Sequence, residues 1–242
     1  SDDRINYWGY TRGFYFAPKE SYCATKEPDR EFRDMIRALH KAGIECIIEM
    51  YFPKGTPSLQ MIRSLWFWKL YYHVDGFHLL GDGVQQDVIE RDPILYGTKK
   101  LFSNVSGEAD AENMLAEYNA GFMLDMRRFL KSDEGMISGA EFHVRRNTGN
   151  FGTVNYMAAQ DGFTLYDTVS YNYRHNEANG EDNRDGSEFN YSWNCGVEGS
   201  TRKTAVRRMR EQQMRNAFLM LLLSQGTPMI YGGDEFANSQ DG

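Results

Sequence analysis

The chain has 242 residues, 41% of them hydrophobic, which is enough for one large domain or two small ones with a sizeable core. Its formal net charge of −7 argues against a nucleic-acid-binding surface, which would need a basic face. We expect no membrane span, because no apolar stretch reaches the roughly 18 residues that a spanning helix needs.

Cysteine usage indicates reduced thiols. Cys23, Cys46 and Cys195 are widely spaced, with no CxxC pair among them. This pattern predicts neither a disulfide framework nor a zinc site. Free thiols are typical of a reducing compartment, so we expect a cytoplasmic location.

The first third of the chain alternates helix and strand patterns. Residues 29–42 place apolar side chains at helical spacing, and Gly43 ends that pattern. Residues 44–51 are an apolar run typical of a buried strand. Pro57 is placed to begin a second helix that extends to about residue 72, and residues 74–80 predict a second strand.

The rest of the chain continues this alternation. The expected elements are a weak helix at 84–90, a strand at 100–104, a helix at 111–130, a strand at 153–159, a polar loop at 172–200, a helix at 204–224 and a strand at 228–231. Strand, helix and strand at this spacing predict an α/β fold with a parallel sheet. Periodicity alone does not distinguish a closed barrel from an open, doubly wound sheet.

Five stretches, in order, resemble the debranching branch of the α-amylase superfamily. They are residues 6–18, 37–48, 73–77, 154–186 and 225–235. Within them, residues 175–186 read HNEANGEDNRDG, a loop specific to the isoamylase and glycogen-debranching group. The resemblance covers almost the whole chain, so we identify it as similar to this type of glycoside hydrolase.

The resemblance implies a fold: a partial (β/α)8 TIM-type barrel holding about strands three to eight. Such barrels carry their active sites at the carboxyl ends of the strands. We expect residues 1–242 to form a single, incomplete barrel domain. It would lack both the domain that the family inserts after strand three and the C-terminal β-sandwich. Two open sheet edges would then need cover, for which pairing into a homo-oligomer is one solution.

The resemblance also implies where the catalytic groups should stand. Retaining enzymes of this type need a carboxylate nucleophile and a carboxylic acid/base about 5–5.5 Å apart. At strand four the nucleophile position is Leu80, which has no lone pair to attack the anomeric carbon. At strand five the acid/base position aligns with Asn104, which cannot donate a proton at ordinary pH. No carboxylate lies between residues 101 and 107.

Other family positions are also changed. Pro53 and Lys54 stand where the family has an asparagine, often a calcium ligand, and a sugar-binding histidine. We therefore predict no metal, and nothing in the sequence calls for a cofactor. At strand seven, Gln160 replaces a histidine, while Asp161 keeps the aspartate that holds sugar hydroxyls in the transition state.

His78 stands where the family has an arginine, two residues before the nucleophile position. It could serve as a base, but a strand-end histidine after an apolar run is more often a hydrogen-bonded core residue. Asp82 and Glu108 lie close enough along the chain to substitute for the lost acids if their loops shift inward. Both positions are also typical of polar turns.

Sugar-contacting features remain. Tyr10 matches the aromatic platform of the family, and Trp8, Trp193, His78 and Gln160 could add contacts to an α-glucan such as glycogen or starch. Three functions stay open. The chain could be a non-catalytic or weakly glucan-binding homologue, an active α-1,6-glucan hydrolase that uses displaced carboxylates, or a structural interaction module without glucan affinity.

Overall fold

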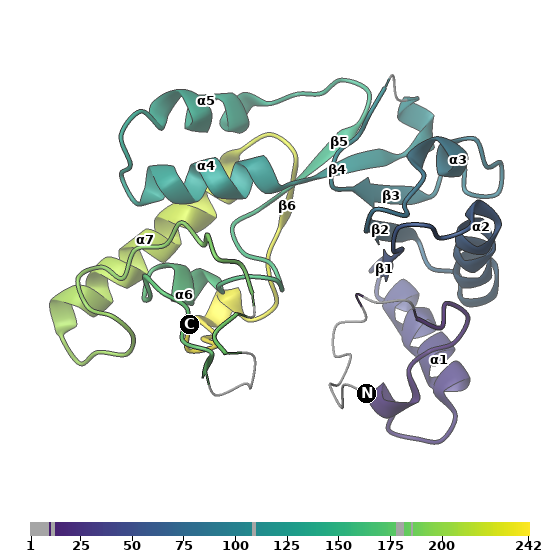
Figure 1. Ribbon diagram of the computed structural model, residues 1–242, viewed down its shortest axis with the longest axis horizontal. Helices are drawn as coiled ribbons and strands as arrows, with labels where there is room; N and C mark the ends of the chain where they lie inside the picture. The colour runs from purple at the N-terminus through teal and green to yellow at the C-terminus, as the bar shows by residue number, and fades with distance from the viewer. Residues whose placement is uncertain (1–9, 11–12, 108–109, 178–181, 185) are drawn as a thin grey trace. The chain divides into compact units, whose positions relative to one another are not determined.

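The fold alternates helices with parallel strands, as the sequence predicts. The computed structural model describes residues 10, 13–107, 110–177, 182–184 and 186–242 (Figure 1). Its elements up to residue 113 are η1 Glu20–Tyr22, α1 Pro28–Lys41, β1 Ile47–Tyr51, α2 Ser58–Phe67, the π-helix η2 Trp68–Tyr72, β2 Gly76–Leu80, α3 Gln86–Glu90, β3 Lys99–Phe102 and η3 Ala111–Asn113. The later elements are β4 Leu115–Asn119, α4 Ala120–Leu130, α5 Ile137–Arg145, β5 Gly152–Tyr156, α6 Leu165–Thr168, α7 Thr204–Leu223, β6 Thr227–Met229 and η5 Asp234–Phe236.

Helix α1 shows how local sequence sets these bounds. Pro28 occupies its first position, where the missing N–H costs nothing, and Asp29 and Glu31 complement the positive end of the helix dipole. Ile36 is the residue that α1 buries most deeply. The helix ends before Gly43, whose φ of 73° is a left-handed conformation that glycine adopts at no steric cost.

The strands follow one another in the order β1-β2-β3-β4-β5-β6, and no described residues pair β6 with β1. The pairs β1–β2, β2–β3, β3–β4 and β5–β6 are parallel. These six strands match the partial barrel expected from the sequence, with β1 in the place of strand three and β6 in that of strand eight. The register sets Glu49 opposite His78, a pairing that the candidate site depends on.

The chain forms two compact units, each with its own apolar core. The first comprises residues 1–118 and 150–152, and the second comprises residues 119–149 and 153–242. Phe52, Leu65 and Phe77 are fully buried in the first core. Phe122 and Ala217 are fully buried in the second, where α4 packs against α5 and α7. Each unit is described by itself below, and a single domain over 1–242 stays a prediction.

The helix expected at 111–130 is wrong in its first half. The structure has η3, then Met114 in a left-handed conformation with a φ of 53°, then β4, and only then α4. Asn119 separates β4 from α4, because its side chain accepts a hydrogen bond from Phe122 N at 3.1 Å and caps the helix. This cap was the boundary signal within the apparently continuous helical pattern.

Two helices were missed and one connection agrees with expectation. Helices α5 and α6 were not predicted; α6 is only four residues long, too short for a periodic pattern.

Strand β1 ends at Tyr51 and α2 begins at Ser58, so no domain is inserted between them. The described part of residues 172–200 contains no α-helix or strand, in agreement with the predicted polar loop.

Candidate functional site at the carboxyl ends of the strands

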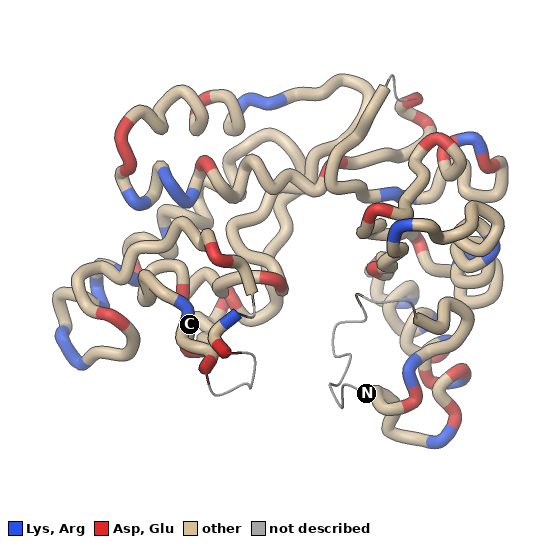
Figure 2. The backbone as a smooth tube through the Cα atoms, viewed as in Figure 1, with Lys and Arg blue, Asp and Glu red and all other residues tan. Residues whose placement is uncertain are grey.

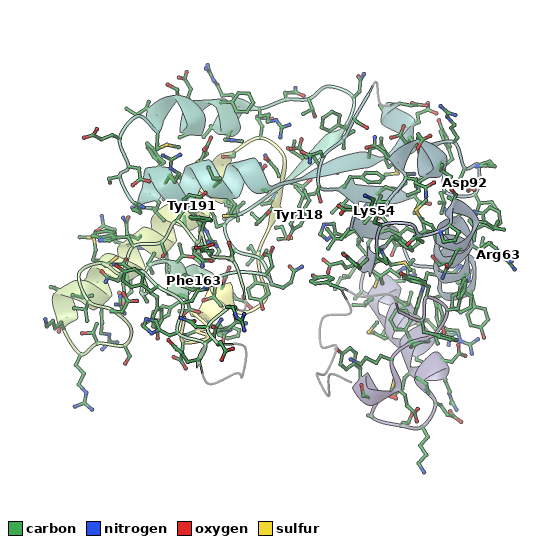
Figure 3. All side chains as sticks on the ribbon, viewed as in Figure 1. Lys54, Arg63, Asp92, Tyr118, Phe163 and Tyr191 are labelled. Atoms are coloured by element: carbon green, nitrogen blue, oxygen red, sulfur yellow. The ribbon has the colours of Figure 1, made fainter. Side chains whose placement is uncertain are left out.

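In the first unit, Glu49 and His78 form the centre of a polar cluster. Glu49 Oε2 lies 2.8 Å from His78 Nδ1, and Tyr10 Oη donates a 2.6 Å hydrogen bond to Glu49 Oε1. The ring of Tyr118 on β4, labelled in Figure 3, stacks on the His78 ring, with centroids 4.2 Å apart. Side chains from β1, β2 and β4 therefore meet at this imidazole, and the segment around residue 10 contacts Glu49.

The carboxylate at Nδ1 decides which proton His78 carries. An ionised carboxylate only accepts hydrogen bonds, so neutral His78 must hold its proton on Nδ1 and leave a lone pair on Nε2. His78 is 7% exposed, and its Nε2 has no hydrogen-bond partner among the described residues. His78 is thus a buried, hydrogen-bonded residue, the alternative that the sequence favoured over a free base.

The end of β2 places Leu80 beside a tight turn. Leu80 is the last residue of the strand, and its carbonyl accepts a 2.8 Å hydrogen bond from Phe52 N. Asp82 follows in a turn between two glycines and is exposed. A Cβ atom at Gly81 would lie 2.4 Å from Phe52 O, so this turn is packed tightly against the chain after β1.

The other expected positions of the first unit lie on loops or outside the described part. Asn104 is exposed two residues beyond the end of β3. Trp8 and Glu108 lie outside the described residues. The structure therefore brings together Tyr10, His78 and the unpredicted partner Glu49, whereas no described contact links Asn104 to them.

In the second unit, Asp161 and Gln160 follow β5 on its carboxyl side. Asp161 is exposed, and its backbone carbonyl accepts a 3.1 Å hydrogen bond from Ser187 N. Burial, followed by the negative charge of Asp161, raises the pKa of Tyr156 to about 12. The carboxylate of Asp161 therefore lies close enough to Tyr156, the last residue of β5, for its charge to affect the pKa of that residue.

Arg127 on α4 holds the segment that carries Asp161. This buried guanidinium donates hydrogen bonds to Met157 O at 2.6 Å, Asn190 O at 2.9 Å and Phe163 O at 3.1 Å. Burial lowers the pKa of Arg127 to about 10, although the nearby carboxylate of Asp234 opposes that shift. Sequence analysis did not single out Arg127, because its three partners are backbone carbonyls. Every residue has such a carbonyl, so the sequence does not indicate which of them an arginine will bind.

Asp234 in η5 is the acidic partner of this framework. It is 3% exposed and its Oδ1 accepts a 2.9 Å hydrogen bond from Leu165 N at the start of α6. Burial raises the pKa of Asp234 to about 6, although the Leu165 N–H and the charge of Arg127 oppose the shift. This hydrogen bond thereby links the segment after β6 to the segment after β5.

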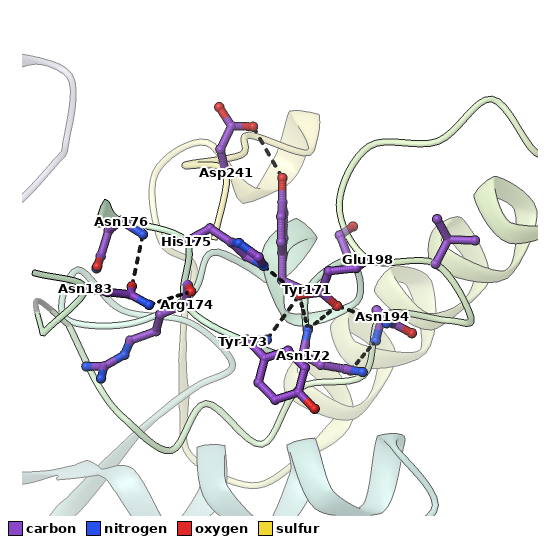
Figure 4. A network of polar contacts seen from close by, with 12 residues as sticks. Tyr171, Asn172, Tyr173, Arg174, His175, Asn176, Asn183, Asn194, Glu198 and Asp241 are labelled. Atoms are coloured by element: carbon purple, nitrogen blue, oxygen red, sulfur yellow. Dashed lines mark hydrogen bonds and ion pairs between the residues drawn. The ribbon is translucent and has the colours of Figure 1, made fainter. Parts of the chain in front are cut away.

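The polar loop after β5 is organised by Glu198 (Figure 4). Its carboxylate accepts hydrogen bonds from Asn172 N, Tyr173 N, the Asn194 side chain and His175 Nε2. Burial alone would raise the pKa of Glu198, but these hydrogen bonds outweigh it and hold the pKa below its usual value. This carboxylate is thus a structural centre of the loop.

Neither a metal cage nor a membrane span was found within the described part of the chain. No group of three or more His, Cys, Asp or Glu side chains there could hold a metal ion. No described helix is both long and apolar enough to cross a bilayer. The expected absence of a metal remains a prediction.

Comparison with solved structures identifies the class of fold. A pullulanase from Paenibacillus barengoltzii in complex with maltotetraose superposes with a TM-score of 0.66 and 16% identity, over 96% of this chain and 44% of that one. A product complex of the glycogen-degrading pneumococcal virulence factor SpuA gives a TM-score of 0.59 and 20% identity, over 96% of this chain and 29% of that one. The fold is therefore that of part of a pullulanase-type barrel.

Curated relatives identify the family. A glycogen operon protein GlgX homolog of Mycobacterium tuberculosis is 31% identical, over 98% of this chain and 43% of its own length. The GlgX homolog of Haemophilus influenzae is 32% identical, over 98% and 48%, and the maize chloroplastic isoamylase SU1 is 28% identical, over 100% and 43%. No protein-family model matches the chain. The chain belongs to the α-amylase superfamily and is of the debranching-enzyme type.

The chain spans less than half the length of these relatives. The alignment with the Mycobacterium tuberculosis protein extends over 316 residues, more than the 242 of this chain. The relatives therefore contain segments within the aligned region that have no counterpart here. The short connection between β1 and α2, where the family inserts a domain, is one place for such a difference.

Proposed function

We propose that this chain is a debranching-type barrel segment that binds α-glucan but does not hydrolyse it. The observation that carries the proposal is the pair of residues at the expected catalytic positions, Leu80 at the end of β2 and Asn104 after β3. Leucine cannot form a glycosyl-enzyme intermediate, and asparagine cannot protonate a leaving group. Neither half of a retaining mechanism is then supplied at its usual place.

The polar cluster of the first unit supports this reading. A carboxylate does lie close to the expected nucleophile position, but Glu49 is engaged by Tyr10 and His78. Each Glu49 oxygen accepts a hydrogen bond, one from Tyr10 and one from His78, so the carboxylate is held on β1 and oriented toward the imidazole. Glu49 thus supports the imidazole instead of replacing the missing nucleophile.

Binding of α-glucan is the part of the family activity that these residues can still support. Tyr10 offers an aromatic ring, and Asp161 and Gln160 offer hydrogen-bonding groups after β5. Relatives named for the glycogen operon or as isoamylases, and a pullulanase bound to maltotetraose, make glycogen or starch the first ligands to test. A cytoplasmic location belongs to the same proposal, and rests on three free cysteines.

Affinity electrophoresis in gels that contain glycogen tests binding. We expect glycogen to retard the chain, and Tyr10→Ala and Asp161→Ala each to reduce the retardation at least threefold. Asp87→Ala, an exposed acid at the start of α3, is the control and should leave it unchanged. A chain that migrates equally with and without glycogen would instead favour a structural interaction module.

An active hydrolase that uses a displaced carboxylate is the second candidate, because Asp161 is retained and Asp82 follows Leu80 closely. It requires Asp82 to leave the tight turn whose glycines pack against Phe52 and Pro53. It predicts that Asp82→Asn abolishes hydrolysis. The non-catalytic proposal predicts no hydrolysis to abolish.

A further inference from the structure

A cavity of about 560 Å³ lies between α1 and η2, in the first unit. Its lining includes Arg33, Arg37 and Lys41 from one helix, together with His40, His73 and the ring of Tyr71, and it includes no acidic residue. The volume falls within the range typical of small-molecule sites, about 300–1,000 Å³. Its location separates it from the candidate glucan site.

That separation follows from the topology. Lys41 ends α1 shortly before β1 begins, and His73 follows η2 shortly before β2 begins. The cavity therefore lies toward the amino ends of these strands, whereas Glu49, His78 and Leu80 lie toward their carboxyl ends. A ligand in this cavity would not compete directly with a glucan at the opposite end.

The cations stand on one face of α1. Arg33, Arg37 and Lys41 are spaced four residues apart, which places them on successive turns of the same side. Charged residues of both signs are interspersed along much of the chain, whose net charge is −7, although residues 202–210 carry five cations and no acid (Figure 2). The lining side chains with a formal charge are all positive, and three lining residues pair with acids outside the lining: Arg33 with Asp29, Arg37 with Asp34 and His40 with Asp75.

The hydrogen bonds show which cations are available to a ligand. Arg33 pairs with Asp29 and lies over the Tyr71 ring at 5.0 Å, so it is fixed in place. Arg37 donates to Asp34 Oδ1 at 3.2 Å, which uses one of its five N–H groups. Lys41 makes no ion pair within the part of the chain that the structure describes.

Stabilisation of the helix end explains only part of this arrangement. Cations in the last turn of a helix complement its dipole, and that accounts for His40 and Lys41. Arg33 and Arg37 precede the last turn, where the dipole effect has faded. These two arginines pair with Asp29 and Asp34 on the same helix, and Arg37 keeps unused N–H groups for a ligand.

We propose that this cavity binds a small organic phosphate. A phosphate group carries about −1.5 to −2 charges at neutral pH, and guanidinium and ammonium groups are its usual partners. Arg37 and Lys41 supply donors for the phosphate. Tyr71, 45% exposed, offers the edge of its ring to the organic part, because Arg33 lies over the ring and Phe67 stacks on it.

Isothermal titration calorimetry on the whole chain tests the proposal with four probes: glucose 6-phosphate, AMP, inorganic phosphate and glucose. We expect a phosphorylated probe to bind at least tenfold more tightly than glucose, and more tightly than inorganic phosphate. The better of the two organic phosphates would identify the organic part as a sugar or a nucleoside. Binding of glucose alone, or of no probe at millimolar concentration, would overturn the proposal.

Three variants then locate the site. The double variant Arg37→Gln/Lys41→Gln should weaken phosphate binding at least tenfold, and Tyr71→Ala should weaken the organic phosphate but not inorganic phosphate. Arg30→Gln is the matched control, because Arg30 is an exposed arginine of the same helix that also pairs with Asp34 but does not line the cavity. An equal loss in Arg30→Gln would contradict a defined site. Unchanged thermal unfolding would show that each variant is folded.

Discussion

His78 and Glu49 face each other across neighbouring parallel strands, and their side chains meet at 2.8 Å between Nδ1 and Oε2. We expect Glu49→Ala to lower the free energy of unfolding by roughly 1–3 kcal/mol, because it leaves a buried imidazole with neither nitrogen paired. Urea denaturation measures the loss. Asp82→Ala, at an exposed turn position near the end of β2, should change the free energy of unfolding by less than about 0.5 kcal/mol. Equal effects of the two variants would show that the pair has no structural role.

Arg127 gives a second prediction. Arg127→Met should destabilise the chain by about 3–5 kcal/mol, because it removes the donors to three carbonyls and the positive charge that acts on the buried Asp234. Its neighbour Arg128 pairs with Asp133 at 3.3 Å on a half-buried surface, and Arg128→Met should cost less than about 1 kcal/mol. Thermal and urea unfolding of the two variants make the comparison. A difference below 1 kcal/mol between them would contradict the role given to Arg127.

Asp234 makes stability depend on pH. Its pKa is raised from 3.8 to about 6 in the folded chain, so the folded state holds its proton more tightly than the unfolded state does. The resulting stabilisation is fully present below about pH 4 and is lost as the pH rises through 6. Asp234→Asn keeps an acceptor for Leu165 N and has no charge to bury. We expect the free energy of unfolding of Asp234→Asn to equal that of the parent at pH 4 and to exceed it by roughly 1–3 kcal/mol at pH 7.

Urea denaturation at pH 4, 5, 6 and 7 checks this prediction. Asp133→Asn is the control, since that carboxylate lies in a surface ion pair with Arg128. If the difference in free energy of unfolding between the parent and Asp234→Asn stays the same from pH 4 to pH 7, Asp234 is not the titrating group.

Lys100 gives the opposite pH dependence. It is fully buried on β3, its Nζ donates a 2.7 Å hydrogen bond to Leu95 O, and burial, followed by the charge of Lys69, lowers its pKa to about 8. The folded state thus holds this proton less tightly than the unfolded state. Lys100 therefore lowers the free energy of unfolding most below pH 8, and this destabilisation decreases as the pH rises toward 10.5.

Comparison with Lys100→Met isolates this effect. We expect the stability of the parent relative to Lys100→Met to rise by roughly 1–3 kcal/mol between pH 7 and pH 10. Lys99→Met is the control, because Lys99 is more exposed and pairs with Glu45. A constant difference between parent and Lys100→Met over this range would contradict the buried-lysine account.

Much of the fold could be predicted from the sequence because its helices and strands have strong periodic or apolar patterns. Helices α1 and α7 lie within a residue of their predicted bounds. The strand β4 was missed because Leu115 to Asn119 is short and continues directly into α4. Only the side-chain cap at Asn119 divides them, and Asn also occurs inside helices, so the residue alone is a weak signal.

The candidate site could be predicted only by position. The resemblance indicated where Leu80, Asn104 and Asp161 should stand. The partner of His78 was not predicted, because Glu49 is 29 residues away in the chain and only the strand register brings the two together. Arg127 was missed for the same reason, since its partners are carbonyls at least 30 residues away.

Reducing-end release from amylopectin tests the central claim most directly. The assay needs a high concentration of the chain and an Asp161→Asn variant prepared in parallel. We predict no release above the buffer blank for either protein, because Leu80 and Asn104 supply neither nucleophile nor acid. Release by the parent that disappears in Asp161→Asn would contradict this account and show that another carboxylate acts as the nucleophile.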